Sequence, residues 1–516
     1  MNYRTRLGLS AIAVSLAMAA YANDNALPQT RLDLTGLDDA GTYRGFIVTY
    51  RDGTDNAVQR QASLERSNAA LARTSALGVA SKTPARLHHA RHVASNGEVF
   101  VASQPLDAAR ARRVAEILAS DAAVAFVQPD YLLQPAALPD DQYYSHYQWD
   151  YLPADGLGFI DPKTWMPVSN DGGANIQKAW DLSRGEGIVI ASLDTGVTQH
   201  PDLDVSLADD GYDFITDSTF SGRTQDGRVA GGWDTGDWTA PGQCGPLTRA
   251  NASSWHGTHV FGTAGGQTTG NGIGMAGTAH GAQVLPIRVL GHCGGLMSDI
   301  ADAITWASGG HVEGIPDNAH PAQAISLSLG GPGQCPAQSV MARAIAEANE
   351  RGATVVVAAG NSNTDVSRFT PANCPGVVTV AATGITSRRA WYSNYGEGIT
   401  LAAPGGGVYD DDASTGATTD TGFIWSASNS GATTPTHSSY AGVAGTSQAA
   451  PHVTGTVAMM QSYRHSLGKA LLTPAQVSEL LRASAATPAI APSAAKPIGA
   501  GLLDAYEAVR VAGEAP

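Results

Sequence analysis

One serine in the sequence stands where its hydroxyl could act as a nucleophile. Ser447 follows the small pair Gly445-Thr446, and an apolar, alanine-rich run continues from it to about Tyr463. This pattern predicts a buried helix with the serine in its first turn, where unpaired backbone N–H groups and the helix dipole favour negative charge. A serine in that place can attack a carbonyl carbon while its own N–H holds the oxyanion. The alternative is an ordinary N-terminal cap.

Acyl transfer by a serine also needs a base, a carboxylate that orients the base, and a further oxyanion donor. Asp194 ends the apolar run Ile188–Leu193, which predicts a carboxylate at the carboxyl end of a strand, where α/β proteins form their sites. His256 begins a run of small and apolar residues typical of a buried helix. Asn361 follows the apolar run Ala353–Ala359, and its amide could donate to an oxyanion.

Each of these candidates also has a plainer interpretation. An Asp or Asn at the end of a strand is most often a turn or cap residue. His256 and His259 are three residues apart and could bind a metal, but no nearby carboxylate completes a zincin-type helix. The case for catalysis therefore depends on the candidates occurring together.

The elements that would position these residues alternate along the C-terminal part of the chain. Short apolar runs typical of strands are separated by helical patterns, which predicts an α/β fold of three layers, a parallel sheet with helices on both faces. The predicted strands are Ile188–Leu193, Gln283–Leu290, Ala324–Leu329, Ala353–Ala359 and Val377–Ala381. The predicted helices are Ser298–Ser308, Gln338–Arg351, Gly445–Tyr463, one that starts at Thr473, and Gly501–Val511. Stretches 206–254 and 405–437, rich in Gly, Asp, Ser and Thr, predict long surface loops.

The N-terminal part of the chain has a different organisation. Two arginines precede the apolar run Leu7–Ala20, and small residues favour cleavage after Ala22, so residues 1–22 are predicted to be a signal peptide. From about residue 45, the order strand, helix, strand, strand, helix, strand matches a small ferredoxin-like α+β domain. Such a domain could be a binding module or a folding aid that is later removed. Residues 135–151, rich in Pro, Asp and Tyr, predict a linker.

Charge and composition exclude some classes of partner. The chain carries 46 acidic and 31 basic residues, a net charge of −15, and the acidic excess lies after residue 135. This argues against nucleic acid as a partner. After the signal, no stretch has the ~20 apolar residues of a membrane-spanning helix. We therefore expect a secreted, extracellular monomer that binds neither nucleic acid nor membrane.

The cysteines are even in number, which in an exported protein predicts disulfides. Four cysteines allow three pairings, and the sequence alone does not choose among them. A zinc site built from all four is the alternative, although no pair has the short spacing usual in zinc sites. The four are Cys244, Cys293, Cys335 and Cys374.

Taken together, the candidate motifs resemble those of the subtilisin-like serine proteases, or subtilases. The motifs are Asp-Thr-Gly from Asp194, His-Gly-Thr-His from His256, Ala-Ala-Gly-Asn ending at Asn361, and Gly-Thr-Ser-Gln-Ala-Ala-Pro-His around Ser447. Their order along the chain, Asp then His then Ser, is that of subtilisin. The resemblance covers about residues 170–511. It implies a subtilisin-like fold, a catalytic triad of Asp194, His256 and Ser447, and Asn361 as the oxyanion donor.

The resemblance has further implications for substrate and maturation. It implies that Ser328, Leu329 and Gly330 pair with the substrate backbone and that Gly295 and Leu296 belong to the opposite wall of the cleft. It also implies that residues 23–136 are an inhibitor-type propeptide of the catalytic domain 137–516. The expected protein is then a secreted serine endopeptidase that acts on proteins or peptides, with its own propeptide as an intramolecular inhibitor that it removes itself.

The resemblance also implies structural calcium and a disulfide pairing. Asp202 and Asn271 resemble ligands of the family's strong calcium site, where oxygen ligands are expected. The insert 209–237 contains three acids that are candidates for another ion, although they could equally be solvated loop residues: Asp226, Asp234 and Asp237. Similar exported proteins imply the pairs Cys244–Cys293 and Cys335–Cys374.

Two other functions remain open at this point. One is a maturation protease with a narrow cleavage motif. The other is a catalytically silent, subtilase-like binding protein, against which the intact set of Asp, His, Asn and Ser candidates argues.

Overall fold

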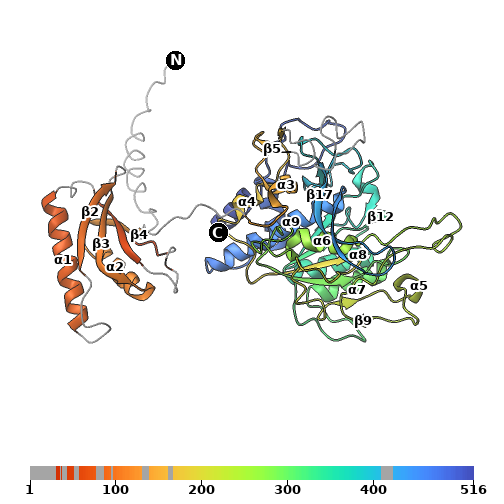
Figure 1. Ribbon diagram of the computed structural model, residues 1–516, viewed down its shortest axis with the longest axis horizontal. Helices are drawn as coiled ribbons and strands as arrows, with labels where there is room; N and C mark the ends of the chain where they lie inside the picture. The colour runs from red at the N-terminus through yellow and green to blue at the C-terminus, as the bar shows by residue number, and fades with distance from the viewer. Residues whose placement is uncertain are drawn as a thin grey trace, which may run out of the picture. The chain divides into compact units, whose positions relative to one another are not determined.

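The computed structural model describes residues 31–34, 37, 43–51, 57–76, 86–93, 97–130, 139–160, 167–407 and 422–516. The chain divides into two compact units between Pro135 and Ala136 (Figure 1). Each unit has its own buried hydrophobic core. The predicted signal peptide at 1–22 lies outside the described residues. No helix in the described ranges has the length and apolar character needed to cross a bilayer.

The N-terminal unit is a four-stranded antiparallel sheet with two helices. Its strand order is β2-β3-β1-β4. The elements are β1 Tyr43–Tyr50, α1 Ala57–Ala76, β2 Leu87–Val93, β3 Gly97–Leu106, α2 Ala108–Ala119 and β4 Val124–Asp130. Asp107 caps α2 by accepting a hydrogen bond from the Arg110 N–H at 2.9 Å. This order and sheet confirm the predicted ferredoxin-like pattern.

The C-terminal unit is built on an eight-stranded sheet of order β16-β15-β13-β11-β7-β10-β8-β9. All neighbouring strands are parallel except the last pair, β8 and β9. The strands are β7 Val189–Asp194, β8 Tyr212–Asp213, β9 Val229–Ala230, β10 Gln283–Arg288, β11 Ala324–Leu327, β13 Thr354–Ala358, β15 Val378–Thr383 and β16 Leu401–Pro404. The five predicted strands form the centre of this sheet.

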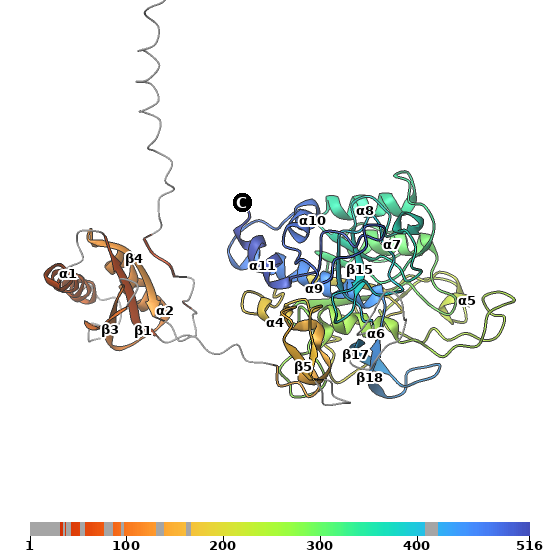
Figure 2. The same cartoon turned by 90° about the horizontal axis from the view of Figure 1, so that it is seen from above.

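Helices cover both faces of the sheet. They are α6 His256–Phe261, α7 Met297–Ala307, α8 Val340–Glu350, α9 Thr446–Ser466, α10 Pro474–Ala483 and α11 Ala505–Glu514. Figure 2 shows α7 and α8 side by side, apart from α9. Along β13, Val355 and Val357 belong to the core under α7 and α8, whereas Val356 belongs to the core under α9. This alternation, which follows from the strand repeat of two, confirms the three layers.

Short elements complete the unit. The single-turn helices are α3 Tyr144–Tyr147, η1 Trp149–Tyr151, α4 Ile176–Ala179, α5 Ser218–Ser221, η2 Gly262–Gly266 and η3 Val366–Arg368. The strand pairs are β5 Gly158–Ile160 with β6 Pro167–Ser169, β12 Gly331–Pro332 with β14 Phe369–Thr370, and β17 Ile424–Asn429 with β18 Ser438–Val443.

Three predictions about connecting segments are wrong. The predicted surface loop 206–254 contains β8 and β9, two strands of the large sheet, and its Phe214 and Ile215 are fully buried. The predicted linker 135–151 is, from residue 139, part of the C-terminal unit, because Tyr144, Trp149 and Tyr151 are buried in it. The predicted surface loop 405–437 contains strand β17, whose Ile424 and Ala427 are fully buried. In these segments, residues typical of loops are mixed with the side chains that pack, so the local composition conceals the burial.

Candidate active site

The candidate base and its carboxylate meet at the end of β7. Asp194 is the last residue of this strand and is 1% exposed. Its Oδ1 lies 2.8 Å from Nδ1 of His256, the first residue of α6, and accepts the Thr195 N–H at 2.7 Å. A neutral imidazole that donates from Nδ1 to this carboxylate has Nε2 free to accept a proton. In this tautomer the imidazole could serve as a general base.

The surroundings of His256 set its pKa. Burial by itself lowers the pKa of the imidazole, but the charge of Asp194 and its hydrogen bond outweigh burial and raise it. The carboxylates of Asp237 and Asp234 raise it further. The imidazole is consequently protonated at a higher pH than that of an ordinary histidine.

Two bridges join these carboxylates to the start of α6. Thr195 Oγ1 donates to Asp234 Oδ2 at 2.6 Å and accepts the Gly257 N–H at 2.9 Å. Ser254 Oγ donates to Asp237 Oδ2 at 2.6 Å and accepts the His256 N–H at 3.2 Å. Asp234 and Asp237, which were predicted as metal ligands, therefore fix the turn that carries the His256 side chain.

We expect Asp237→Asn to move the acid limb of the kcat/KM profile to lower pH. Removing a negative charge lowers the pKa of His256, so the imidazole stays neutral, and active as a base, in more acidic solution. The profile should be measured with the mature enzyme. Asp226→Asn, which removes an equal charge elsewhere in the same insert, is the control and should leave the limb in place. An unchanged limb in Asp237→Asn would contradict this electrostatic role.

The candidate nucleophile lies in the first turn of α9. Ser447 Oγ donates to the Ser328 carbonyl at 3.2 Å, and Ser328 Oγ donates to the Ser447 carbonyl at 2.8 Å. Helix α9 contacts β7 and α6, the two elements that carry Asp194 and His256. Although both side chains are described, no hydrogen bond joins Ser447 to His256 in this structure. The hydroxyl must turn away from Ser328 to reach the imidazole.

Two hydrogen-bond donors lie next to each other beside the nucleophile. Asn361 Oδ1 accepts the Thr446 N–H at 2.8 Å and the Thr446 hydroxyl at 2.9 Å, which fixes the orientation of the amide. A Cβ placed on Gly445 would lie 2.8 Å from Gln448 Oε1, 3.3 Å from Asn361 Nδ2 and 3.6 Å from the Ser447 nitrogen, so only glycine fits here without a clash. The Asn361 amide and the Ser447 N–H are two neighbouring donors of the kind that an oxyanion requires.

The substrate-binding candidates lie at the same edge of the sheet. The strands β10, β7, β11 and β13 are adjacent and parallel, so their carboxyl ends meet at one edge. Ser328–Gly330 follow β11, and Ser328 contacts Ser447 directly. Gly295 and Leu296 lie between β10 and α7, with Leu296 40% exposed.

The two residues predicted for the strong calcium site lie together, with a third that sequence reasoning missed. Asp202 is fully buried, and its Oδ2 accepts the Met275 N–H at 3.0 Å and the Tyr440 hydroxyl at 3.2 Å. Asn271 Nδ2 lies 3.4 Å from Asp202 Oδ1. Asp141 accepts the Gly270 N–H at 2.9 Å and so binds the same loop, 268–275. Asp141 was missed because it falls in the predicted linker.

The acids of the insert are not gathered into one site. Asp226 accepts the Ser218 N–H at 2.9 Å beside α5, apart from the bridges of Asp234 and Asp237. The described ranges contain no group of three or more His, Cys, Asp or Glu residues placed to hold a metal. Burial raises the pKa of Asp234 to about 7.

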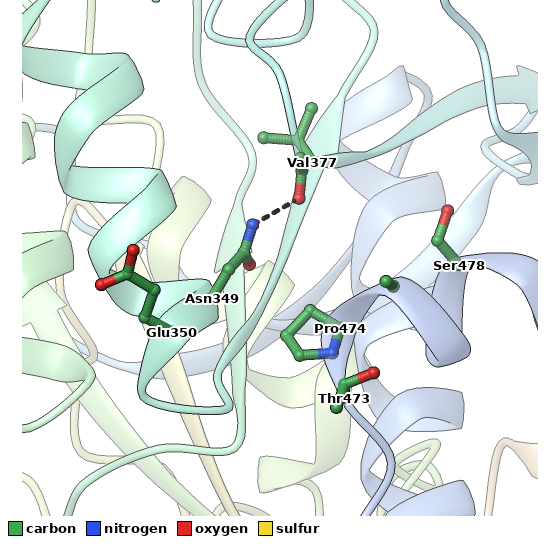
Figure 3. Close-up of a pocket in the computed structure, with 8 residues that line it drawn as sticks. Asn349, Glu350, Val377, Thr473, Pro474 and Ser478 are labelled. Atoms are coloured by element: carbon green, nitrogen blue, oxygen red, sulfur yellow. Dashed lines mark hydrogen bonds between the residues drawn. The ribbon is translucent and has the colours of Figure 1, made fainter.

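The hollow in Figure 3 lies at the opposite edge of the sheet. It is lined by Asn349, Glu350, Gly376, Val377, Thr473, Pro474, Ala475 and Ser478. Asn349 Nδ2 donates to the Gly376 carbonyl at 2.9 Å, which fixes one wall. None of the residues that line it is among the predicted site residues.

The structure forms both disulfides that the resemblance implied. Cys244 bonds to Cys293, 49 residues on, and Cys335 bonds to Cys374, 39 residues on. In the chain-entropy model, closing loops of this size stabilises by roughly 4 kcal/mol each. A zinc site of four cysteines is therefore excluded.

Comparison with known proteins agrees with this geometry. Residues 185–501 match the family described as the subtilase family. The chain belongs to the subtilase family. An extracellular protease of Xanthomonas campestris pv. campestris is 42% identical to it over 511 residues, 98% of this chain and 78% of that protein. An extracellular basic protease of Dichelobacter nodosus is 37% identical over 472 residues, 90% of this chain and 70% of that protein.

A solved structure supports the same assignment. This structure, described as proteases from Pseudoalteromonas arctica, is 39% identical to this subtilase and has a TM-score of 0.63. The match covers 73% of this subtilase and 100% of the solved chain. This subtilase has the subtilisin-like fold and is a secreted serine endopeptidase. Members of the family generally bind calcium.

Proposed function

We propose that this subtilase hydrolyses peptide bonds in a range of proteins, through a triad of Asp194, His256 and Ser447, and that it is made as a self-processing zymogen. The observation that carries the proposal is the 2.8 Å contact between His256 and Asp194 at the sheet edge that also bears Ser447. The donors Asn361 Nδ2 and the Ser447 N–H beside Gly445 support it.

In the proposed reaction, the imidazole moves the proton. Ser447 Oγ leaves the Ser328 carbonyl, gives its proton to His256 Nε2 and attacks the substrate carbonyl carbon. Asp194 stabilises the imidazolium that forms. Asn361 and the Ser447 N–H bind the oxyanion, each donor lowering the barrier by roughly 3 kcal/mol. His256 then protonates the leaving amine, and a water molecule hydrolyses the acyl-enzyme with His256 again as base.

The proposed substrate path follows β11. The backbone of Ser328–Gly330 would pair with the substrate chain, because this segment begins where Ser328 contacts the nucleophile. Gly295 and Leu296, exposed between β10 and α7, would form the facing wall. Backbone pairing does not depend on substrate side chains, which suits an enzyme that accepts many proteins.

Residues 23–136 are proposed to be the propeptide, after a signal peptide at 1–22, with 137–516 as the catalytic domain. The separate hydrophobic core of the N-terminal unit supports this, because its removal would leave the core of the catalytic domain intact. The proposed cleavage is near Pro135–Pro139, most of which lies outside the described residues. The propeptide would act as an intramolecular inhibitor until it is cut.

The loop 268–275 is proposed to hold a structural calcium ion. The acids at this loop suit such an ion, because Asp202 and Asp141 offer carboxylate oxygens there. Asn271 donates its amide nitrogen to Asp202 Oδ1 and would have to turn its oxygen inward to act as a ligand. Burial of Asp202, with the charge of Asp141 nearby, raises the pKa of Asp202 to about 6, so the pair is costly without a cation. The ion would stabilise the loop and take no part in the chemistry.

We expect chelation with EDTA to lower the Tm of the mature enzyme by several degrees, because an ion that binds only the folded state stabilises it. Asp202→Asn should lower the Tm in calcium and remove most of the further effect of EDTA. Asp226→Asn is the matched control and should keep the response of the wild type. If EDTA leaves the Tm of the wild type unchanged, the calcium proposal is wrong.

A fluorophosphonate probe tests the function itself. The probe should label the mature protein and block its hydrolysis of casein. A catalytically silent binding protein would take up no label. A maturation protease of narrow specificity would be labelled but would cut few members of a peptide library, whereas the proposed enzyme should cut many.

A further inference from the structure

The helix that carries Ser447 lacks one of its own hydrogen bonds directly at the nucleophile. Pro451 lies inside α9 and has no N–H, so the Ser447 carbonyl loses the partner that it would have four residues further on. The Ser328 hydroxyl donates to this carbonyl instead, at 2.8 Å. The first turn of α9 therefore relies on a side chain from another segment of the chain.

A histidine in the second turn of α9 also contacts the first turn. His452 Nδ1 lies 2.8 Å from the carbonyl oxygen of Gln448, the residue after the nucleophile. Its Nε2 lies 2.7 Å from Asp150 Oδ2, and both side chains are fully buried. A carbonyl oxygen only accepts, so Nδ1 carries a hydrogen, and Nε2 shares one proton with the carboxyl group. The ring thus joins the backbone beside Ser447 to a distant part of the chain.

Asp150 has a fixed position in its own segment. It belongs to the single turn η1, and its carbonyl accepts the Ala174 N–H at 2.8 Å. The next residue, Tyr151, is 1% exposed, and its ring lies edge to face against the ring of His452 with the centroids 5.6 Å apart. Because hydrogen bonds and packing hold this turn, it gives α9 a rigid neighbour.

We propose that Asp150 and His452 are positioning residues, which set the place of the Ser447 hydroxyl at the start of α9. The inference rests on the proposed function, in which Ser447 is the nucleophile, and it gives the segment after the proposed propeptide a part in catalysis. The pair acts through the backbone of Gln448 and not on the reacting atoms. A misplacement of about 1 Å at a reacting group is enough to slow an enzyme about 10²-fold.

The test measures kcat, KM and the rate of labelling by a fluorophosphonate in the mature enzyme. Asp150→Ala leaves Nε2 of His452 without a partner, so kcat and the labelling rate should fall about 10- to 100-fold, with KM within about threefold of the wild type. Asp150→Asn should recover most of this loss, because its amide can donate to Nε2 and keep the ring in place. Maturation needs one cut per molecule, so a slowed variant still matures.

The matched control is Asn318→Ala, which removes a buried amide at the end of α7, on the other face of the sheet. Asn318 Nδ2 donates to the carbonyls of Trp306 and Ala307, each at 3.2 Å. This variant and Asp150→Ala should both have a lower Tm than the wild type. Only Asp150→Ala should lose kcat and labelling rate, since a general loss of stability does not move Ser447.

Labelling of the wild type separates this inference from the proposed function. A wild type that takes up no label contradicts the proposed function. With a labelled wild type, the inference alone is overturned if Asp150→Ala keeps the kcat of the wild type, or if Asn318→Ala loses as much as Asp150→Ala.

His452→Gln decides the matter if Asp150→Ala does not fold. Its amide can still donate to Asp150 but offers no second donor to the Gln448 carbonyl, so the same fall in kcat and labelling rate is expected. A His452→Gln enzyme with the kcat of the wild type would overturn the inference.

Discussion

Ser447→Ala is expected to accumulate as an uncut precursor and to hydrolyse no added substrate. The proposed cut near Pro135–Pro139 uses the same hydroxyl as external substrates, so one substitution stops both. Removal of a triad serine costs about 10⁶-fold in kcat. Mass spectrometry of the purified variant after incubation gives the processing result, and casein hydrolysis gives the activity.

The matched control is Ser466→Ala, at the other end of the same helix, where an exposed hydroxyl donates to the Tyr463 carbonyl at 2.7 Å. This variant should mature like the wild type. A trace of active wild type added to Ser447→Ala should cut the joined precursor, which shows that the variant is folded and its junction accessible. Spontaneous maturation of pure Ser447→Ala would refute self-processing.

Asn361→Ala is expected to lower kcat by about 10²- to 10³-fold with a much smaller change in KM. In the proposed mechanism the Asn361 amide donates to the oxyanion, which forms only as the transition state is reached, so ground-state binding of substrate should be largely spared. Steady-state kinetics of the mature enzyme give kcat and KM separately.

The Asn361 amide also accepts two hydrogen bonds from Thr446, so the Tm should be measured in parallel to detect a loosened start of α9. Asn363→Ala, two residues further on and exposed, is the control; its side chain accepts a hydrogen bond from Lys496 Nζ at 3.0 Å. An Asn361→Ala enzyme with the kcat of the wild type would show that the oxyanion is held by other donors.

The central sheet was predictable because strands buried on both faces are continuous apolar runs. Strand β7 leads directly to Asp194, and β13 ends just before the turn of Asn361, so locating these strands also located the candidates. The first turn of α9 was predictable from the small residues that precede Ser447. These features are local, so a short stretch of sequence is enough to predict them.

Long-range partners were not predictable from such patterns. His452 in α9 lies 2.7 Å from Asp150, and both side chains are fully buried although 302 residues separate them. Asp150 and Asp141 fall in a segment whose Pro, Asp and Tyr content is that of a linker, and only the packed structure gives them partners.

The roles of the insert acids depend on the same kind of information. Asp234 and Asp237 were predicted from their charge alone, which does not distinguish a calcium ligand from an acceptor for Thr195 or Ser254. The sequence shows the acids but not which hydroxyl groups donate hydrogen bonds to them.

The most direct test of the triad is peptide mapping by mass spectrometry after reaction of the mature enzyme with a fluorophosphonate. We expect one modified residue, Ser447, and loss of that modification in His256→Ala, because the imidazole must remove the hydroxyl proton. Modification at another serine, or equal labelling of Ser447 without the imidazole, would contradict it.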